Sequence, residues 1–251
     1  MIILNEREYI ENAILEETID PAKAYLTLSI YARYLYYEKQ LKKPEIIREL
    51  NAFMSAKYPR YNPVDWSASI ERYAGRAGKY PLCECPGVWL TATELSIVES
   101  LQNKVLERLA FTLLCLAKFR NFRNPENHGW INYSNGEIYS MACINTTAFE
   151  KDCRLNQLRD LGLIRFAKRV DSLSIQVLFT DEASENRLFI SDFRKLGYEW
   201  RAYNGEKYLR CAGCGILTRR QNNRQKYCKH CSDLIRSNRQ KDLMRERRKI
   251  C

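Results

Sequence analysis

The sequence of 251 residues predicts a mainly helical protein of the α+β class, built from three consecutive parts. Three observations support this prediction. Apolar residues recur at helical spacing over the first 80 residues, capping motifs and an alternating strand pattern follow, and two cysteine pairs stand close to the C-terminus. We therefore expect a helical N-terminal region at 1–80, a middle domain at 81–206 and a small C-terminal domain at 207–251.

Helices account for most of the predicted N-terminal region. Apolar and aromatic side chains recur every three or four residues over 22–39, and similar patterns cover 44–56 and 66–76. Pro44 suits the first turn of the second helix. The tyrosines of 22–39 would suit either a base-stacking platform or a packed core. Because one buried face of a helix fully explains the spacing of these tyrosines, we expect them to build a hydrophobic core.

The middle region begins with a predicted hairpin at 81–92, in which Pro86-Gly87 supplies the turn. Cys83 and Cys85 form a C-x-C pair inside it. This spacing is too short for a metal-binding C-x2-C turn, and the neighbouring sequence offers no partner ligands. We therefore expect no second metal site in this segment.

Capping boxes, in which Ser or Thr precedes Glu by three residues, mark three helix starts in the middle region. They are Thr91–Glu94, Ser134–Glu137 and Thr147–Glu150. The first predicts a long helix over 93–119, with Asn124-Pro125 as its stop signal. The other two predict helices that reach Cys143 and Leu161.

Two strands are predicted next, at 163–168 and 173–179, joined by residues 169–172. Long helix, short helix, turn, helix and two-stranded wing follow one another over about 93–180. This order resembles a winged helix-turn-helix domain. Residues 188–197 mix strand and helix signals, and we expect a small helix that packs on the wing.

A winged-helix domain would place its second helix, here about 147–161, in the DNA major groove. If its three leucines, Leu155, Leu158 and Leu161, point inward, five other residues point outward at 100° per residue. They are Phe149, Asp152, Cys153, Asn156 and Asp160. Acidic side chains are poorly suited to a phosphate-lined groove. The wing is better equipped, with Arg165, Lys168 and Arg169. The domain therefore either reads DNA weakly or faces a protein.

Two C-x2-C pairs in the C-terminal domain predict a structural zinc site. Cys211 and Cys214 form the first pair, and Cys228 and Cys231 follow after 13 intervening residues. Four thiolates match Zn²⁺ and close its tetrahedral shell, which leaves no open position for catalysis. His230 is an alternative fourth ligand, although two C-x2-C pairs are the simpler set. The pattern fits a treble-clef finger or a zinc ribbon.

Positive charge is concentrated in the same domain. Residues 207–250 hold 14 Lys or Arg and 3 Asp or Glu, a net charge of +11 that equals the net charge of the whole chain. Such a concentration indicates a polyanionic partner, with a merely solvated tail as the alternative. We expect nucleic-acid contacts from Arg219, Arg220, Arg224, Lys226, Lys229, Arg236, Arg239, Lys241 and Arg245.

Several classes of protein are disfavoured by the sequence. The chain has two histidines, and it shows no Walker loop, G-x-S-x-G or H-E-x-x-H motif, so we expect no enzyme. No run approaches the roughly 18 apolar residues of a membrane span, and the N-terminus does not read as a signal peptide. Six further cysteines are scattered without disulfide spacing. We expect a cytoplasmic protein without a membrane partner.

The segments R-C-A-G-C-G at 210–215 and N-R-Q-K-Y-C-K-H-C at 223–231 are similar to the C-terminal zinc finger of uncharacterised bacteriophage and prophage proteins of Gram-positive bacteria. Segments 109–118 and 189–198 resemble the same group. The resemblance implies a protein of a phage or mobile element that works in the cytoplasm of a bacterial host. It implies no biochemical role.

Charge, metal site and resemblance together predict a non-enzymatic nucleic-acid-binding protein with a role in regulation or replication, acting on DNA in preference to RNA. The alternative is an inhibitor of a host nucleoprotein machine, such as a defence nuclease, that acts like an anti-CRISPR protein. It would use protein contact and compete for nucleic acid. The acidic and apolar outward side of 147–161 favours this alternative.

Overall fold

The computed structural model describes residues 2–168 and 174–250, and within the last helix it describes side chains up to Lys241 together with Leu243 and Met244. The chain divides into two compact units. One is Ile3–Pro86, and the other holds Ile2 and the residues from Gly87 onward. Helices predominate and three small antiparallel sheets accompany them, which confirms the α+β class.

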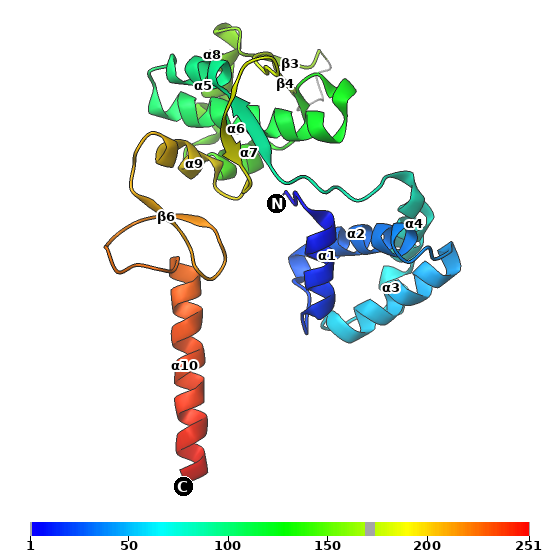
Figure 1. The fold of residues 1–251 in the computed structure, drawn as a ribbon. Helices are drawn as coiled ribbons and strands as arrows, with labels where there is room; N and C mark the ends of the chain where they lie inside the picture. Colours follow the sequence, from blue (N-terminus) through cyan, green and yellow to red (C-terminus); the bar gives the residue numbers. More distant parts are fainter. Residues whose placement is uncertain (1, 169–173, 251) are drawn as a thin grey trace. The chain divides into compact units, whose positions relative to one another are not determined.

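Four helices build the unit Ile3–Pro86 (Figure 1, blue to cyan). They are α1 (Glu6–Leu15), α2 (Ala24–Tyr37), α3 (Lys43–Lys57) and α4 (Pro63–Arg76), with short 3-10 turns η1 (Pro21–Lys23) and η2 (Ala77–Lys79). The helices predicted at 22–39, 44–56 and 66–76 are confirmed. Asp20 and Asn62 cap their helices through side-chain oxygens, and a proline follows each of them at the first helical position.

Aromatic packing and one buried ion pair hold this unit together. Tyr31 contacts Phe53 with ring centroids 4.7 Å apart, and Tyr25 stacks on Trp66 at 4.6 Å. Core packing is confirmed for Tyr31, which is buried, whereas Tyr25, Tyr36 and Tyr37 of the same helix are exposed. Buried Glu6 accepts hydrogen bonds from Arg33 at 2.7 and 2.8 Å and from the backbone N–H of Cys83 at 2.7 Å.

Helices and a three-stranded sheet form the middle of the second unit. The elements in chain order are α5 (Ala92–Glu99), α6 (Lys104–Arg123), η3 (Pro125–Asn127), β2 (Trp130–Ile131), α7 (Asn135–Met141), α8 (Ala148–Asp160), β3 (Ile164–Phe166) and β4 (Ile175–Val177). All three predicted capping boxes are present, at Thr91, Ser134 and Thr147. The strands pair antiparallel in the order β2-β4-β3. The predicted connection 169–172 lies outside the described residues.

The predicted long helix over 93–119 is wrong in one respect, because the structure contains two helices there. Helix α5 ends at Glu99, and α6 begins at Lys104. Gln102 adopts a left-handed conformation with φ of +47°. Asn103 then caps α6 by accepting from the N–H groups of Val105 and Leu106. Helix α6 is the centre of this unit, with Phe111 and Leu113 among its fully buried residues.

The predicted hairpin at 81–92 does not form. Strand β1 (Val88–Thr91) pairs instead with β5 (Asn186–Ile190), in a register that places Val88 opposite Ile190 and Trp89 opposite Phe189. Val88 and Ile190 are buried, so burial favours this distant partner. Residues 186–190 are consequently a strand, where a helix was expected from 188.

Helix α9 (Leu196–Tyr203) follows β5 and packs on α6, whereas we expected it on the wing. The Trp200 ring lies 5.2 Å from Phe111, and its Nε1 donates to Glu107 at 3.1 Å. Gly197 lets α9 also approach the C-terminal end of α7, since a Cβ there would lie 1.9 Å from the carbonyl oxygen of Ala142. Helix α9 also contacts the C-terminal hairpin of the chain, through contacts that are described below.

Candidate metal centre and basic groove

A short hairpin and the start of a long helix bring the four predicted metal ligands together. Strands β6 (Tyr208–Arg210) and β7 (Leu217–Arg219) pair antiparallel, and helix α10 spans Lys229–Ile250. Cys211 and Cys214 lie in the turn between the strands, and Cys228 precedes α10. Cys231 lies in the first turn of α10. We call residues 207–231 the finger.

The backbone of the turn is shaped for two sulfurs. Gly215 has φ of +72°, and its N–H donates to the carbonyl oxygen of Cys211 at 2.8 Å. Gly213 leaves room for the second pair, because a Cβ there would lie 3.2 Å from Cys231 Sγ. The N–H of Ala212 donates to the carbonyl of Lys226 at 2.9 Å and ties the turn to the second half of the finger.

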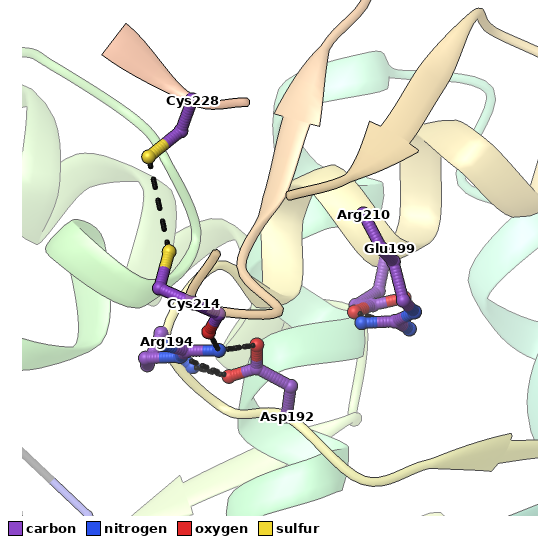
Figure 2. Close-up of polar contacts among 6 residues, drawn as sticks. All are labelled: Asp192, Arg194, Glu199, Arg210, Cys214 and Cys228. Atoms are coloured by element: carbon purple, nitrogen blue, oxygen red, sulfur yellow. Dashed lines mark hydrogen bonds and ion pairs between the residues drawn. The ribbon is translucent and has the colours of Figure 1, made fainter. Parts of the chain in front are cut away.

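The sulfur positions fit a tetrahedral metal ion. All four Sγ atoms lie within 4.8 Å of one another, and Figure 2 shows Cys214 facing Cys228 with their Sγ atoms 3.8 Å apart. A tetrahedral shell with metal–sulfur distances of about 2.3 Å requires sulfur–sulfur separations of about 3.8 Å. His230 is exposed and lies outside this cluster, so its role as an alternative ligand gains no support.

Neighbouring groups shift the acidity of two of these thiols in opposite directions. Burial opposes ionisation of Cys211, but the backbone N–H groups of Cys228, Cys214 and Gly213 outweigh it and lower the pKa of Cys211 to about 6. Contact with the Cys214 side chain, followed by burial, raises the pKa of Cys231 to about 12. Cys211 is therefore a stronger acid than Cys231, and a divalent cation would stabilise both as thiolates.

Two charged contacts join the finger to the preceding part of the same unit (Figure 2). Arg194 donates through Nη2 to the carbonyl oxygen of Cys214 at 2.9 Å, and Asp192 holds the same guanidinium at 2.8 Å. Arg210 of β6 donates to both carboxylate oxygens of Glu199 on α9, at 2.9 and 3.0 Å. Burial raises the pKa of Glu199 against the opposing effect of Arg210.

A hollow of about 940 Å³ opens beside the metal site, between β7, the loop 220–227 and the first turns of α10. We call it the basic groove and define it by its five cations: Arg219, Arg224, Lys226, Lys229 and Arg236. Tyr227 and Tyr198 also line it. Five of the residues predicted to contact nucleic acid are therefore brought to one concave surface.

The other predicted contact residues lie elsewhere. Arg220 donates to the backbone carbonyls of Asn222 and Asn223, so it shapes the loop. Arg165 on β3 bonds to Gln176 of β4, and Lys168 is exposed just after β3. Arg239 and Lys241 are exposed further along α10. Arg169 and the side chain of Arg245 lie outside the described residues.

The cations of the basic groove are electrostatically available. Within the described part of the chain, Arg219, Arg224, Lys226 and Lys229 form no ion pair, and Arg236 approaches Asp233 only at 3.9 Å. Arginines outside the groove are often neutralised, as Arg33 is by Glu6 and Arg194 by Asp192. The groove, whose lining also includes Asp233, therefore carries a net positive charge that would attract anions.

Helix α8 presents the acidic and apolar side that its sequence predicts, with one exception. Leu155 and Leu158 are buried, but Leu161 is 58% exposed, so its predicted inward position is wrong. Phe149 is 76% exposed at the start of the helix. Asp152 and Asp160 are exposed on the same helix, and Cys153 and Asn156 are half-buried.

Sequence reasoning did not identify the residues that α9 and its approach contribute to this region. Tyr198 lines the basic groove, and Asp192 and Arg194 hold the backbone of a metal-ligand residue. The adjacent charges of Asp192 and Arg194 were a visible local signal. Their target, the carbonyl of Cys214, lies 20 residues further along the chain and could not be read from their spacing.

Comparisons with family models, with curated proteins and with solved structures give no match to this chain. Among the residues that the structure describes, no helix combines the length and the apolar character needed to cross a membrane.

Proposed function

We propose that this chain is a non-enzymatic nucleic-acid-binding protein that binds phosphates in the basic groove formed mainly by its finger and the first turns of α10. The observation behind the proposal is the convergence of Arg219, Arg224, Lys226, Lys229 and Arg236 on one hollow, four of them without an ion-pair partner among the described residues. Lysine and arginine neutralise backbone phosphates and release counterions, which is the dominant source of sequence-independent affinity.

The proposed cofactor is one structural Zn²⁺ held by Cys211, Cys214, Cys228 and Cys231. Four soft thiolates prefer Zn²⁺ to hard cations, and a closed shell leaves the ion no open position. One pair in a hairpin turn and the other at a helix start is the arrangement of a treble-clef finger. The ion would hold β7, the loop 220–227 and α10 in the positions that create the groove.

The middle of the second unit supports a winged-helix assignment. Its elements run α6, β2, α7, α8, β3, β4, and the sheet order β2-β4-β3 places the first strand beside the last. In such a domain α8 would be the recognition helix. Exposed Asp152 and Asp160 make α8 a poor partner for phosphates, so we assign nucleic-acid contact to the finger.

A second candidate function uses α8 for protein contact. Phe149 is 76% exposed beside the exposed carboxylate of Asp152, a combination more suitable for a protein surface than for DNA. The chain would then inhibit a host nucleoprotein complex, with α8 on the protein and the finger competing for nucleic acid. This second hypothesis is compatible with the resemblance to phage proteins and with action in a bacterial cytoplasm.

Salt-dependent binding tests the proposal. Replacing Arg224 and Lys226 by alanine should weaken binding to DNA and reduce the slope of log K against log salt by about 2, one unit for each lost phosphate contact. Arg48→Ala with Arg187→Ala removes the same charge from exposed sites outside the finger and serves as the control. Equal slopes for the two double variants would overturn the assignment of the groove.

A further inference from the structure

We infer that the basic groove accepts single-stranded nucleic acid, with a base stacked on Tyr227, in preference to an intact duplex. This inference rests on the proposed function and names the class of substrate for the same groove. It depends on three properties of the groove: its concave shape, an aromatic ring among its cations, and two loop side chains, Asn222 and Gln225, that bond to the backbone of the loop.

The shape favours one strand. The hollow holds about 940 Å³ and is bounded by β7, the loop 220–227, the first turns of α10 and, from α9, Tyr198. A duplex presents its phosphates on the outside of a broad cylinder, and its bases remain stacked within it. A single strand can follow a concave wall of cations and turn its unstacked bases inward.

Tyr227 is placed to receive a base. Its side chain is 37% exposed and lines the groove between Lys226 and the start of α10. One edge of the ring lies against the turn that holds Cys211 and Cys214, since a Cβ on Gly213 would lie 3.6 Å from Tyr227 Cδ1. Tyr198 also lines the groove, but its ring already packs on Tyr208 at 5.0 Å. Tyr227 is therefore the stacking residue.

The loop amides hold the loop in shape, which argues against base-specific reading. Gln225 Oε1 accepts from the N–H of Gln221 at 2.7 Å, and its Nε2 donates to the carbonyl of Tyr227 at 3.2 Å. Asn222 Oδ1 accepts from the N–H of Arg224 at 3.0 Å. With the Gln225 amide and Asn222 Oδ1 engaged, the main contacts that the groove offers are phosphate contacts and stacking, a combination that tolerates sequence variation.

Fluorescence anisotropy at fixed salt tests the inference on the zinc-loaded full chain. The probes are a labelled 12-nucleotide strand and its blunt duplex, each as DNA and as RNA. We expect the single strand to bind at least tenfold more tightly than the duplex. Tyr227→Leu should weaken single-strand binding about 5- to 160-fold, the effect of losing one base–aromatic stack, and leave duplex binding unchanged. Tyr227→Phe should retain the affinity of the parent protein.

Tyr80→Leu is the matched control, because Tyr80 is exposed and lies outside the finger. One zinc per chain in each variant verifies that the finger is intact. Duplex binding equal to or tighter than single-strand binding, or an unchanged single-strand affinity in Tyr227→Leu, would overturn the inference. If Arg224→Ala with Lys226→Ala still weakens binding in that case, the proposed function stands. If neither change matters, both fail. Comparing the DNA and RNA probes identifies which strand the groove prefers.

Discussion

Replacing Cys231 by serine should release the metal and unfold the finger alone. Cys231 lies in the first turn of α10, and its Sγ belongs to the cluster of four sulfurs. A serine hydroxyl stays protonated at neutral pH and is a poor zinc ligand. Because the variant retains three cysteines, its zinc content should fall well below one ion per chain, as measured by elemental analysis.

The finger buries little apolar surface, so its stability depends mainly on the metal ion. Besides the cysteines, Leu217 is buried and Ile216 packs partly against the cluster. Burying two aliphatic side chains stabilises by about 3–6 kcal/mol in total. A structural zinc ion contributes about 10–16 kcal/mol at neutral pH. The metal is thus the larger contribution, and its loss should leave the finger unfolded.

Hydrogen exchange monitored by mass spectrometry is the appropriate assay. Protection should disappear at the amides of Cys211, Ala212 and Gly215, whose N–H groups donate to other finger residues. Peptides from α6 should keep their protection, because its core does not include the metal site. Cys153→Ser, at a half-buried cysteine outside the cluster, should change neither zinc content nor exchange. Full protection of the finger in zinc-free Cys231→Ser would refute the reasoning.

Three further predictions concern charge. If the groove binds five phosphates, a salt titration of log K against log salt should give a slope of about −3.5 on a single strand and about −4.5 on duplex DNA. Deletion of 207–251 should remove most of this slope on either probe. Asp152→Asn with Asp160→Asn should leave nucleic-acid affinity unchanged; a gain of about 1 kcal/mol on duplex DNA would show that α8 enters a groove. Lys118→Met should lower the free energy of unfolding by about 3–5 kcal/mol in denaturant titrations, because Glu94, fully buried and 2.9 Å from Lys118 Nζ, would lose its countercharge. A loss under 1 kcal/mol would contradict that.

Features set by neighbouring residues were predicted well from the sequence. A capping box needs only four residues, and the boxes at Thr91, Ser134 and Thr147 all begin helices. Pairing between distant segments was not predictable in the same way. Strand β2 has two residues, too few for an alternating pattern, and β1 finds its partner in β5. Leu161 was misplaced because it is the C-cap of α8, where Gly162 at φ of +74° turns the chain away.

In the candidate site, too, the local features were predictable and the features that depend on the folded loop were not. Ligand spacing is local, so the cysteine cluster was predicted and the structure brings the four sulfurs together. Membership of the groove depends on how the loop 220–227 closes. Arg220 turns to backbone carbonyls at 222 and 223, whereas Arg224 lines the groove. Charge counting treats these two arginines alike, and only the loop conformation separates them.

The pairing of β1 with β5 has a consequence for how the protein is made and divided. The two strands lie about a hundred residues apart in the sequence, and closing a loop of that length slows folding. During synthesis the contiguous unit Ile3–Pro86 can complete its core before the ribosome has made β5, the partner of β1. A fragment cut to 93–180 would lack both strands and leave the α5 capping box without Thr91. An expression fragment of this unit should therefore begin at Gly87 and extend through α9.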